Sequence, residues 1–342
     1  MFTTRRTFLA LAAVGVTALA FAGQAFFPHN TAVAADAPAA EPLKIGYSDW
    51  PGWVAFDVGI QKGFFKETDV KFIWFEYGPS MDAFTANKID AVAVTNGDAM
   101  VTGAGGRTST AVFLTDYSNG NDMIVGKSGF TTIKDLKGKK VGIELNLVEN
   151  LLLVKALEIN GLKDTDVTLV NVPTNETPQA LASGGVDAIG AWYPVAGQAL
   201  KQVAGSKALF TSADLPGLIY DGVYVGKESL ASRRADWLKV AQGWFKTVAY
   251  INDPKTHDEA VKIMAARVQV DPKDYEKSLK GTFILDLDGN LKAYKKGEGL
   301  DSVIGSSNVV DAFNVKAGVY KKAQDVESYF DASLVKEIAE KK

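Results

Sequence analysis

Several residue types and motifs on which enzymes commonly depend are scarce or missing in this chain. It contains no cysteine and only two histidines in 342 residues. Without cysteine there can be no disulfide, no thiolate chemistry and no lipid-anchored cysteine of the usual bacterial kind. His257 is expected on an exposed helix, which gives no basis for a Ser-His triad or a histidine zinc site. With no Gly-x-Ser-x-Gly elbow and no P-loop, the chain is predicted not to be an enzyme and to need no cofactor.

The N-terminus has the pattern of a secretory signal. Arg5 and Arg6 precede an apolar run over 8–23, and Ala32-Val33-Ala34 offers the small residues that a signal peptidase requires. The run contains weakly apolar Ala and Gly and is shorter than the ~20 apolar residues that span a bilayer. We therefore predict a twin-arginine type signal peptide over residues 1–34, cleaved near Ala34, and a periplasmic protein.

The mature chain is acidic. Loss of residues 1–34 removes two arginines and no acid, so the formal net charge moves from −3 to −5. Such a chain is a poor candidate for binding nucleic acid, whose phosphates attract basic surfaces. About 300 residues remain, enough for two lobes that each have a core.

Strand and helix patterns alternate along the mature chain. Apolar runs at 43–47, 70–75 and 91–95 predict strands, with helices at 54–62 and from Ser80 between them. A second series predicts strands at 141–144, 167–172 and 188–192, with helices at 150–158 and 177–182. A further strand at 218–225 is predicted to return to the first lobe, followed by helices such as 236–252. This alternation favours mostly parallel sheets flanked by helices, with ligand sites at the carboxyl ends of the strands.

The predicted organisation is two lobes joined by two hinge crossings. It comprises the signal peptide, a flexible leader at 35–41, the first part of lobe 1 at 42–125, lobe 2 at 126–221, and the return to lobe 1 with C-terminal helices at 222–342. The crossings are predicted near 122–127 and 216–225, and such lobes close on a ligand by hinge motion.

Six short segments near predicted strand ends are rich in acids and aromatics and lack Lys and Arg. They cover 47–53, 95–98, 116–122, 144–149, 192–194 and 220–221. If they meet in one cleft, they form a negative, aromatic cage for a small cationic or amide-like solute. The candidate ligand-binding residues are Tyr47, Asp49, Trp50, Trp53, Asn96, Asp98, Asp116, Glu144, Glu149, Trp192 and Asp221.

Several of these residues have a structural alternative. Asp49 could cap the first helix, and Glu149 suits a helix N-terminus whatever the ligand. Trp50 and Trp53 could simply fill the base of that helix, and Asn96 and Asp98 are also ordinary turn residues. The stretch 286–290 faintly resembles a calcium loop, but a hairpin turn is favoured because its acid spacing stops short.

An ordered set of motifs resembles one family of transport proteins. It includes Ile45-Gly46-Tyr47, Phe64-Phe65-Lys66-Glu67, the run 135–142 and Trp192 with Pro194. Over roughly residues 43–250 the chain resembles the solute-binding proteins of ABC transporters in the nitrate, sulfonate and taurine-like group, with the type II periplasmic binding fold. The resemblance implies a monomer that delivers a solute to permease and ATPase subunits in the inner membrane.

The acidic residues argue against an anionic solute, since like charges repel in a closing cleft. The stretches at 47–53 and 116–122 look most like the branch associated with urea, guanidine and related nitrogen compounds. Guanidinium is flat and can stack on an indole while a carboxylate accepts two parallel N–H bonds. We predict a planar nitrogen-rich cation, guanidine favoured; the alternatives are urea, a small amide, a sulfonate or nitrate. A carboxylate-dependent enzyme or a hard metal site is a further alternative, with no metal expected.

Overall fold

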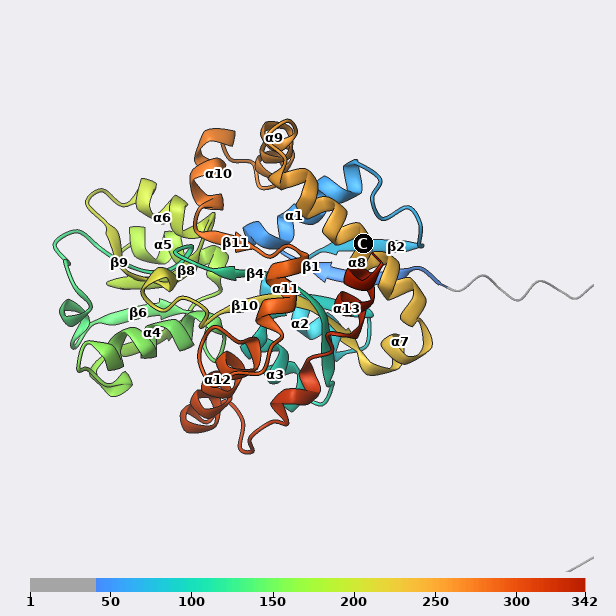
Figure 1. Cartoon of the computed structure of the whole chain (residues 1–342). Helices are drawn as coiled ribbons and strands as arrows, with labels where there is room; N and C mark the ends of the chain where they lie inside the picture. The colour runs from blue at the N-terminus through green and yellow to red at the C-terminus, as the bar shows by residue number, and fades with distance from the viewer. Residues whose placement is uncertain (1–40, 342) are drawn as a thin grey trace, which may run out of the picture. The chain divides into compact units, whose positions relative to one another are not determined.

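The computed structural model describes residues 41–341. The predicted signal peptide and residues 35–40 of the leader lie outside this range. Within it, the chain forms two mixed sheets flanked by helices (Figure 1). No helix in this range is long and apolar enough to cross a membrane.

The first sheet has six strands, in the order β11-β4-β10-β3-β1-β2. They are β1 (Leu43–Tyr47), β2 (Val70–Trp74), β3 (Ala91–Thr95), β4 (Ser109–Ser118), β10 (Tyr220–Gly226) and β11 (Thr282–Ile284). β1 pairs in parallel with β2 and β3, whereas β10 runs antiparallel to both β3 and β4. The predicted strand at 218–225 therefore does return to the first sheet, and it enters in the reverse direction.

The second sheet has five strands, in the order β7-β6-β8-β5-β9. They are β5 (Asp122–Gly126), β6 (Lys140–Ile143), β7 (Thr168–Asn171), β8 (Ala188–Trp192) and β9 (Lys207–Thr211). Helix α4 (Val148–Ile159) contributes Leu152 to one apolar cluster, while α5 (Thr177–Ala182) and α6 (Val195–Gln202) supply Leu181 and Ala196 to another. Adjacent residues Ile124 and Val125 of β5 belong to different clusters, as expected for a strand buried on both faces.

The helices of the first lobe pack against its sheet and against one another. They are α1 (Pro51–Gln61), α2 (Tyr77–Thr85), α3 (Asn96–Ala104), α7 (Lys227–Ser232), α8 (Arg234–Asn252), α9 (His257–Arg267), α10 (Pro272–Leu279), α11 (Leu287–Ala293), α12 (Val303–Ala317) and α13 (Ser333–Glu340). Helix α1 packs on α8 and α9, and α2 and α3 contact β1, β3 and β10. Large aromatics such as Phe56, Phe113 and Trp244 are fully buried between these elements.

Two short stretches connect the lobes, which we define by the two sheets. The chain passes from β4, which ends at Ser118, to β5 in the second sheet, which starts at Asp122. It returns between β9, ending at Thr211, and β10, starting at Tyr220. The limits that the sequence predicted for lobe 2, 126 and 221, differ from these by a few residues. β5 begins at Asp122, before the predicted start of lobe 2, and β10 begins at Tyr220, before its predicted end.

Two local predictions were wrong. The stretch 286–290 is no hairpin turn: Asp286 caps α11, its Oδ1 accepting a 2.8 Å hydrogen bond from the backbone of Gly289. Ser80 does not begin a helix, because α2 already starts at Tyr77, and the Ser80 hydroxyl donates to the Tyr77 carbonyl. In both cases a short polar side chain bonds a backbone group three residues away, which occurs in caps, turns and helix interiors alike.

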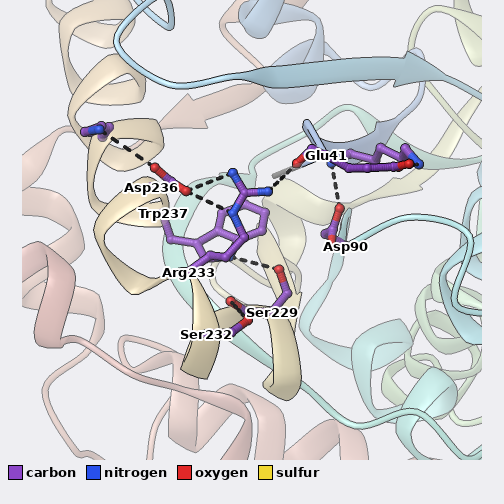
Figure 2. A network of polar contacts seen from close by, with 9 residues as sticks. Glu41, Asp90, Ser229, Ser232, Arg233, Asp236 and Trp237 are labelled. Atoms are coloured by element: carbon purple, nitrogen blue, oxygen red, sulfur yellow. Dashed lines mark hydrogen bonds and ion pairs between the residues drawn. The ribbon is translucent and has the colours of Figure 1, made fainter. Parts of the chain in front are cut away.

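A polar network fixes the chain where it enters β1 (Figure 2). The guanidinium of Arg233 donates to Asp236 Oδ2 at 2.9 Å and to the Glu41 carbonyl. Asp90 accepts a 2.8 Å bond from the backbone of Lys44. None of these side chains belongs to the lining of the acidic cavity at the candidate site.

Candidate functional site

Strand direction brings the predicted segments together. Asp49 and Trp50 follow β1, Thr95 ends β3 and Trp192 ends β8, so all lie at carboxyl ends of strands. Because β10 is antiparallel to β3, its first residues meet the same edge, and Asp221 pairs with Thr95. Asp122 at the start of β5 pairs with Trp192 in the same way.

A small cavity lies where these ends meet. Its volume is about 10 Å³, near the ~10–15 Å³ that one water molecule needs and far below the ~300–1,000 Å³ of sites for drug-sized ligands. Among the residues that the structure describes, its lining contains no Lys, Arg or His; the lining residues are Trp50, Trp53, Tyr77, Thr95, Asp122, Val148, Trp192, Ile219 and Asp221. The lining side chains thus nearly close the cavity, and a solute that enters it must be small and must move them apart.

Aromatic rings form much of its wall. Tyr77 stacks on Trp53 with ring centroids 5.5 Å apart and planes 17° apart. Tyr77 also meets Trp192 edge to face at 5.2 Å, while Trp50 and Trp53 are tilted at 6.4 Å. Such rings offer flat apolar faces and electron-rich surfaces that attract cations.

Two carboxyl groups face this cavity. Asp122 and Asp221 are 3 % and 1 % exposed, and the Oδ2 atom of each has no hydrogen-bond partner. A buried carboxylate without a partner is strongly unfavourable. Each group must therefore hold a proton or receive a donor from a bound solute.

Behind each of these two groups lies a second, buried carboxyl group. Asp116 pairs with Asp221 across β4 and β10, is 0 % exposed, and accepts a 2.8 Å bond from Trp50 Nε1. Glu149, in the first turn of α4, is also 0 % exposed and neither of its oxygens has a hydrogen-bond partner. Neither Asp116 nor Glu149 belongs to the cavity lining.

Glycine makes room for the backing carboxyl of the first lobe. A Cβ atom built on Gly52 would overlap Asp116 Oδ2. Gly52 lies in the first turn of α1, directly after Pro51. The Trp-Pro-Gly-Trp sequence thus places two indoles around a residue small enough to admit a carboxyl group.

Burial raises the pKa of every acid in this region. Desolvation is the largest cause in each case, and it raises the pKa of Asp116 to about 6 and those of Asp98 and Asp122 to about 7. The pKa values of Glu149 and Asp221 rise well above the ordinary range, first through burial and then through their acidic neighbours Asp122 and Asp116. These groups are therefore partly protonated near neutral pH in the absence of a cation.

Asp98 adjoins the cavity through Tyr77. It accepts a 2.6 Å hydrogen bond from the Tyr77 hydroxyl, and its own backbone N–H donates to Thr95 Oγ1 at 3.0 Å. Thr95 is the N-cap of α3, so the cap and the tyrosine together fix this carboxyl. The strong acceptor in turn orients the Tyr77 ring against Trp53.

Other predicted acids bridge the two lobes. Asp49 does not cap α1; its Oδ1 accepts a 2.9 Å bond from Trp192 Nε1 in the second lobe. Burial is the main cause that raises the Asp49 pKa to about 6. Glu144 of the second lobe accepts from Thr174 Oγ1 at 3.0 Å, and its Oε1 would lie 2.7 Å from a Cβ on Gly78 in the first turn of α2. Both contacts require closed lobes.

Tyr47 and Asn96 lie outside the cavity lining. The Tyr47 hydroxyl donates to Asp57 at 3.0 Å. Asn96 donates to the hydroxyls of Ser306 and Ser307 at 3.1 and 3.0 Å, which fastens α3 to α12. Their contacts are those of structural residues in the first lobe.

Sequence reasoning did not select all of the lining. Thr95 and Asp122 belong to the acid-rich segments but were not chosen as ligands. Tyr77 lies outside those segments. It comes shortly after the end of β2 and next to Glu76, so it too is an aromatic residue beside an acid near a strand end. Val148 and Ile219 are ordinary apolar residues whose position only the fold reveals.

Elsewhere in the described chain, the hollows do not combine acids and aromatics without basic residues. A larger hollow of about 580 Å³ beside β11 is bordered by Lys292 and His257 as well as acids, so its charge is mixed. Within residues 41–341, no group of three or more His, Asp or Glu side chains is placed to hold a metal ion.

Comparison with known proteins defines the family. Residues 36–265 match the model of the NMT1-like family, and the chain belongs to that family. A protein of Brucella abortus (strain 2308) named as a binding protein is 25 % identical over 337 residues, which cover 95 % of this chain and 97 % of the relative.

Solved structures share the fold. The periplasmic aliphatic sulphonate binding protein SsuA from Escherichia coli superposes with a TM-score of 0.70 at 19 % identity, covering 85 % of this chain and 92 % of that one. The ligand-binding component of an ABC-type import system from Staphylococcus aureus, solved with zinc bound, gives 0.72 at 18 % identity, covering 87 % and 99 %. The predicted two-lobed α/β periplasmic binding fold is thereby confirmed.

Proposed function

We propose that this chain is the periplasmic solute-binding component of an ABC importer and captures a small, planar, nitrogen-rich cation, with guanidinium the favoured solute. The observation that carries the proposal is the pair of carboxyl groups, Asp122 and Asp221, that face one small cavity with unpartnered oxygens. Family membership and the names of the relatives support the transport role. The name of SsuA gives a solute, a sulphonate, which remains the alternative to the cation.

The cavity offers guanidinium both kinds of contact that it requires. Its N–H groups can donate to Asp122 and Asp221, and its flat face can stack on an indole such as Trp192. No basic side chain from the described part of the chain borders the cavity to compete for those carboxylates. Lobe closure, held by the bond between Trp192 and Asp49, would then exclude water from the charged pair.

Urea or another small amide is the second candidate, and one observation favours it. The indole Nε1 of Trp53 is buried, belongs to a lining residue and has no acceptor. Guanidinium has only donors, whereas urea carries a carbonyl oxygen that could accept this bond. The carboxyl groups favour the cation and the indole N–H favours the amide, so the two solutes must be compared directly.

The experiment is a thermal-shift panel followed by titration calorimetry on the mature protein. The panel contains guanidinium at millimolar concentration, urea, agmatine, taurine, nitrate, Ca²⁺ and Mg²⁺. A solute at one hundred times its Kd adds about 2.7 kcal/mol to the free energy of unfolding. A shift with guanidinium alone, or a larger one than with urea, supports the proposal, whereas a shift only with taurine or nitrate would overturn it.

The same samples test the remaining alternatives. A binding protein is expected to leave the solute chemically unchanged after incubation. Conversion of the solute to a product would instead support the alternative of a carboxylate-dependent enzyme. Small-angle scattering should show a smaller radius of gyration at saturating guanidinium, because a solute between the lobes favours their closure.

A further inference from the structure

We propose that solute binding here is coupled to proton release: a cation entering between Asp122 and Asp221 displaces a proton that the Asp116–Asp221 pair shares in the empty site. The inference rests on the proposed function and states how that site is regulated. It is carried by the arrangement of four buried carboxyl groups as two adjacent pairs.

Both pairs are built by the fold. Asp116 and Asp221 are directly opposite on neighbouring antiparallel strands, so their side chains leave the same face of the sheet. Glu149 and Asp122 approach from α4 and β5 of the second lobe. In each pair one carboxyl faces the cavity and the other is buried behind it.

Two carboxyl groups can share a hydrogen bond only when one of them is protonated. Trp50 already donates to Asp116 Oδ1, which favours the charge on Asp116 and the proton on Asp221. Glu149 has no donor at either oxygen and is the protonated partner of Asp122. The empty cavity is thus lined by the carboxylic acid Asp221 and by Asp122, which shares the proton of Glu149 and whose own pKa burial raises to about 7.

Among residues 41–341, no basic group is seen to offset this arrangement. The ionisable side chains that act on the two pairs from neighbouring elements are acids and tyrosines: Asp98 of α3, Glu144 after β6, Tyr77 of α2, Tyr224 of β10 and Tyr275 of α10. Without a cation, ionisation of Asp221 would add a negative charge to those already on Asp116 and, once ionised, on Asp122. A bound monocation removes that penalty, so the Asp221 proton leaves as the cation binds.

Proton release sets the direction in which the affinity for a cation changes with pH. Because the bound state holds fewer protons than the free state, the affinity for a cation rises with pH. Loss of a full proton gives about a tenfold fall in Kd for each pH unit. Urea brings no charge, so its binding should release no proton and should vary little with pH.

Titration calorimetry of the mature protein with guanidinium chloride at pH 6.5, in phosphate, PIPES and ACES buffers, tests the inference. The slope of the observed enthalpy against the ionisation enthalpy of the buffer counts the protons exchanged. We expect release of about one half to one proton for guanidinium. Binding of guanidinium with no proton release, or with proton uptake, overturns the inference and leaves the proposed function standing; no binding of guanidinium at pH 5.5–8.5 overturns both.

Asp116→Asn is the decisive variant. The amide introduced at this position can still accept from Trp50 and can donate to Asp221 in place of the shared proton, which leaves this pair no proton to release. Proton release with guanidinium should fall and the Kd should depend less steeply on pH, because only Asp122, with a pKa of about 7, would still titrate beside the cation. Asp90→Asn, in the remote network of Figure 2, should keep the wild-type slope. Undiminished proton release in Asp116→Asn would overturn the assignment, and should that variant not fold, the wild-type slope decides alone.

Discussion

Trp192 Nε1 donates a 2.9 Å hydrogen bond to Asp49 Oδ1, and this bond joins the second lobe to the first. The same indole lines the cavity and meets Tyr77 edge to face. One side chain therefore contacts both the space for solute and the opposite lobe. Ion pairs between Lys201 and Asp274 and between Lys316 and Glu158 also cross between the lobes, but they are exposed and contribute little.

Trp192→Phe keeps an aromatic face in the cavity and removes the N–H that reaches Asp49. We expect the solute to dissociate about tenfold faster, because a hydrogen bond to a charged acceptor is worth about 1.5–3 kcal/mol and part of it is offset by water. Stopped-flow fluorescence measures this rate. Trp237→Phe is the control, since that indole bonds Ser229 in the network of Figure 2; equal dissociation rates in both variants would count against the interlobe role.

Asp122→Asn should separate the cationic from the neutral solute. The variant keeps the shape of the side chain and loses its charge, so guanidinium should bind about ten- to hundredfold more weakly. Urea should lose much less, because it brings no charge. Calorimetry with both solutes on wild type, Asp122→Asn and the remote Asp90→Asn measures the difference, and an equal loss for guanidinium and urea would contradict a cation site.

The empty protein should be less stable at pH 8 than at pH 5. Burial raises the pKa of Asp49 and Asp116 to about 6 and of Asp98 and Asp122 to about 7, from an ordinary value of 3.8. Between the two sets of values the folded chain holds more protons than the unfolded chain, so the free energy of unfolding falls as the pH rises. Each unit of pKa difference is worth about 1.4 kcal/mol.

Thermal denaturation without solute from pH 5 to 8 measures this dependence. Glu149→Gln, which replaces the proton-bearing group beside Asp122 by an amide, should show a shallower fall of Tm with pH. A Tm that rises over this range would show that the acids are paired with cations in the folded state.

Gly52→Ala tests the space reserved for the Asp116 carboxyl. The added Cβ overlaps Asp116 Oδ2, so either α1 or β4 must shift. Overpacking of this kind costs about 1–3 kcal/mol and should weaken solute binding by displacing Trp50 and Asp116 together. Chemical denaturation and calorimetry measure the two effects. Gly299→Ala, where a Cβ meets nothing within 4 Å, should change neither quantity.

Much of the fold followed from local patterns. The predicted helix at 54–62 is α1 (Pro51–Gln61), and that at 150–158 is α4 (Val148–Ile159). Both are runs of apolar residues long enough to need burial, and their pattern is local. Ser80 and Asp286 were misread because a polar residue that can cap a helix also fits a turn or a helix interior.

The sequence by itself determined that this chain alternates strand and helix, and that acids and aromatics follow its strands without basic residues among them. Only the tertiary structure decided which of these residues share a cavity. The antiparallel entry of β10 places Asp221 opposite Asp116, and closure of the lobes carries Trp192 to Asp49. Strand register and lobe contact join residues far apart in the chain, whereas composition and periodicity report only on neighbours.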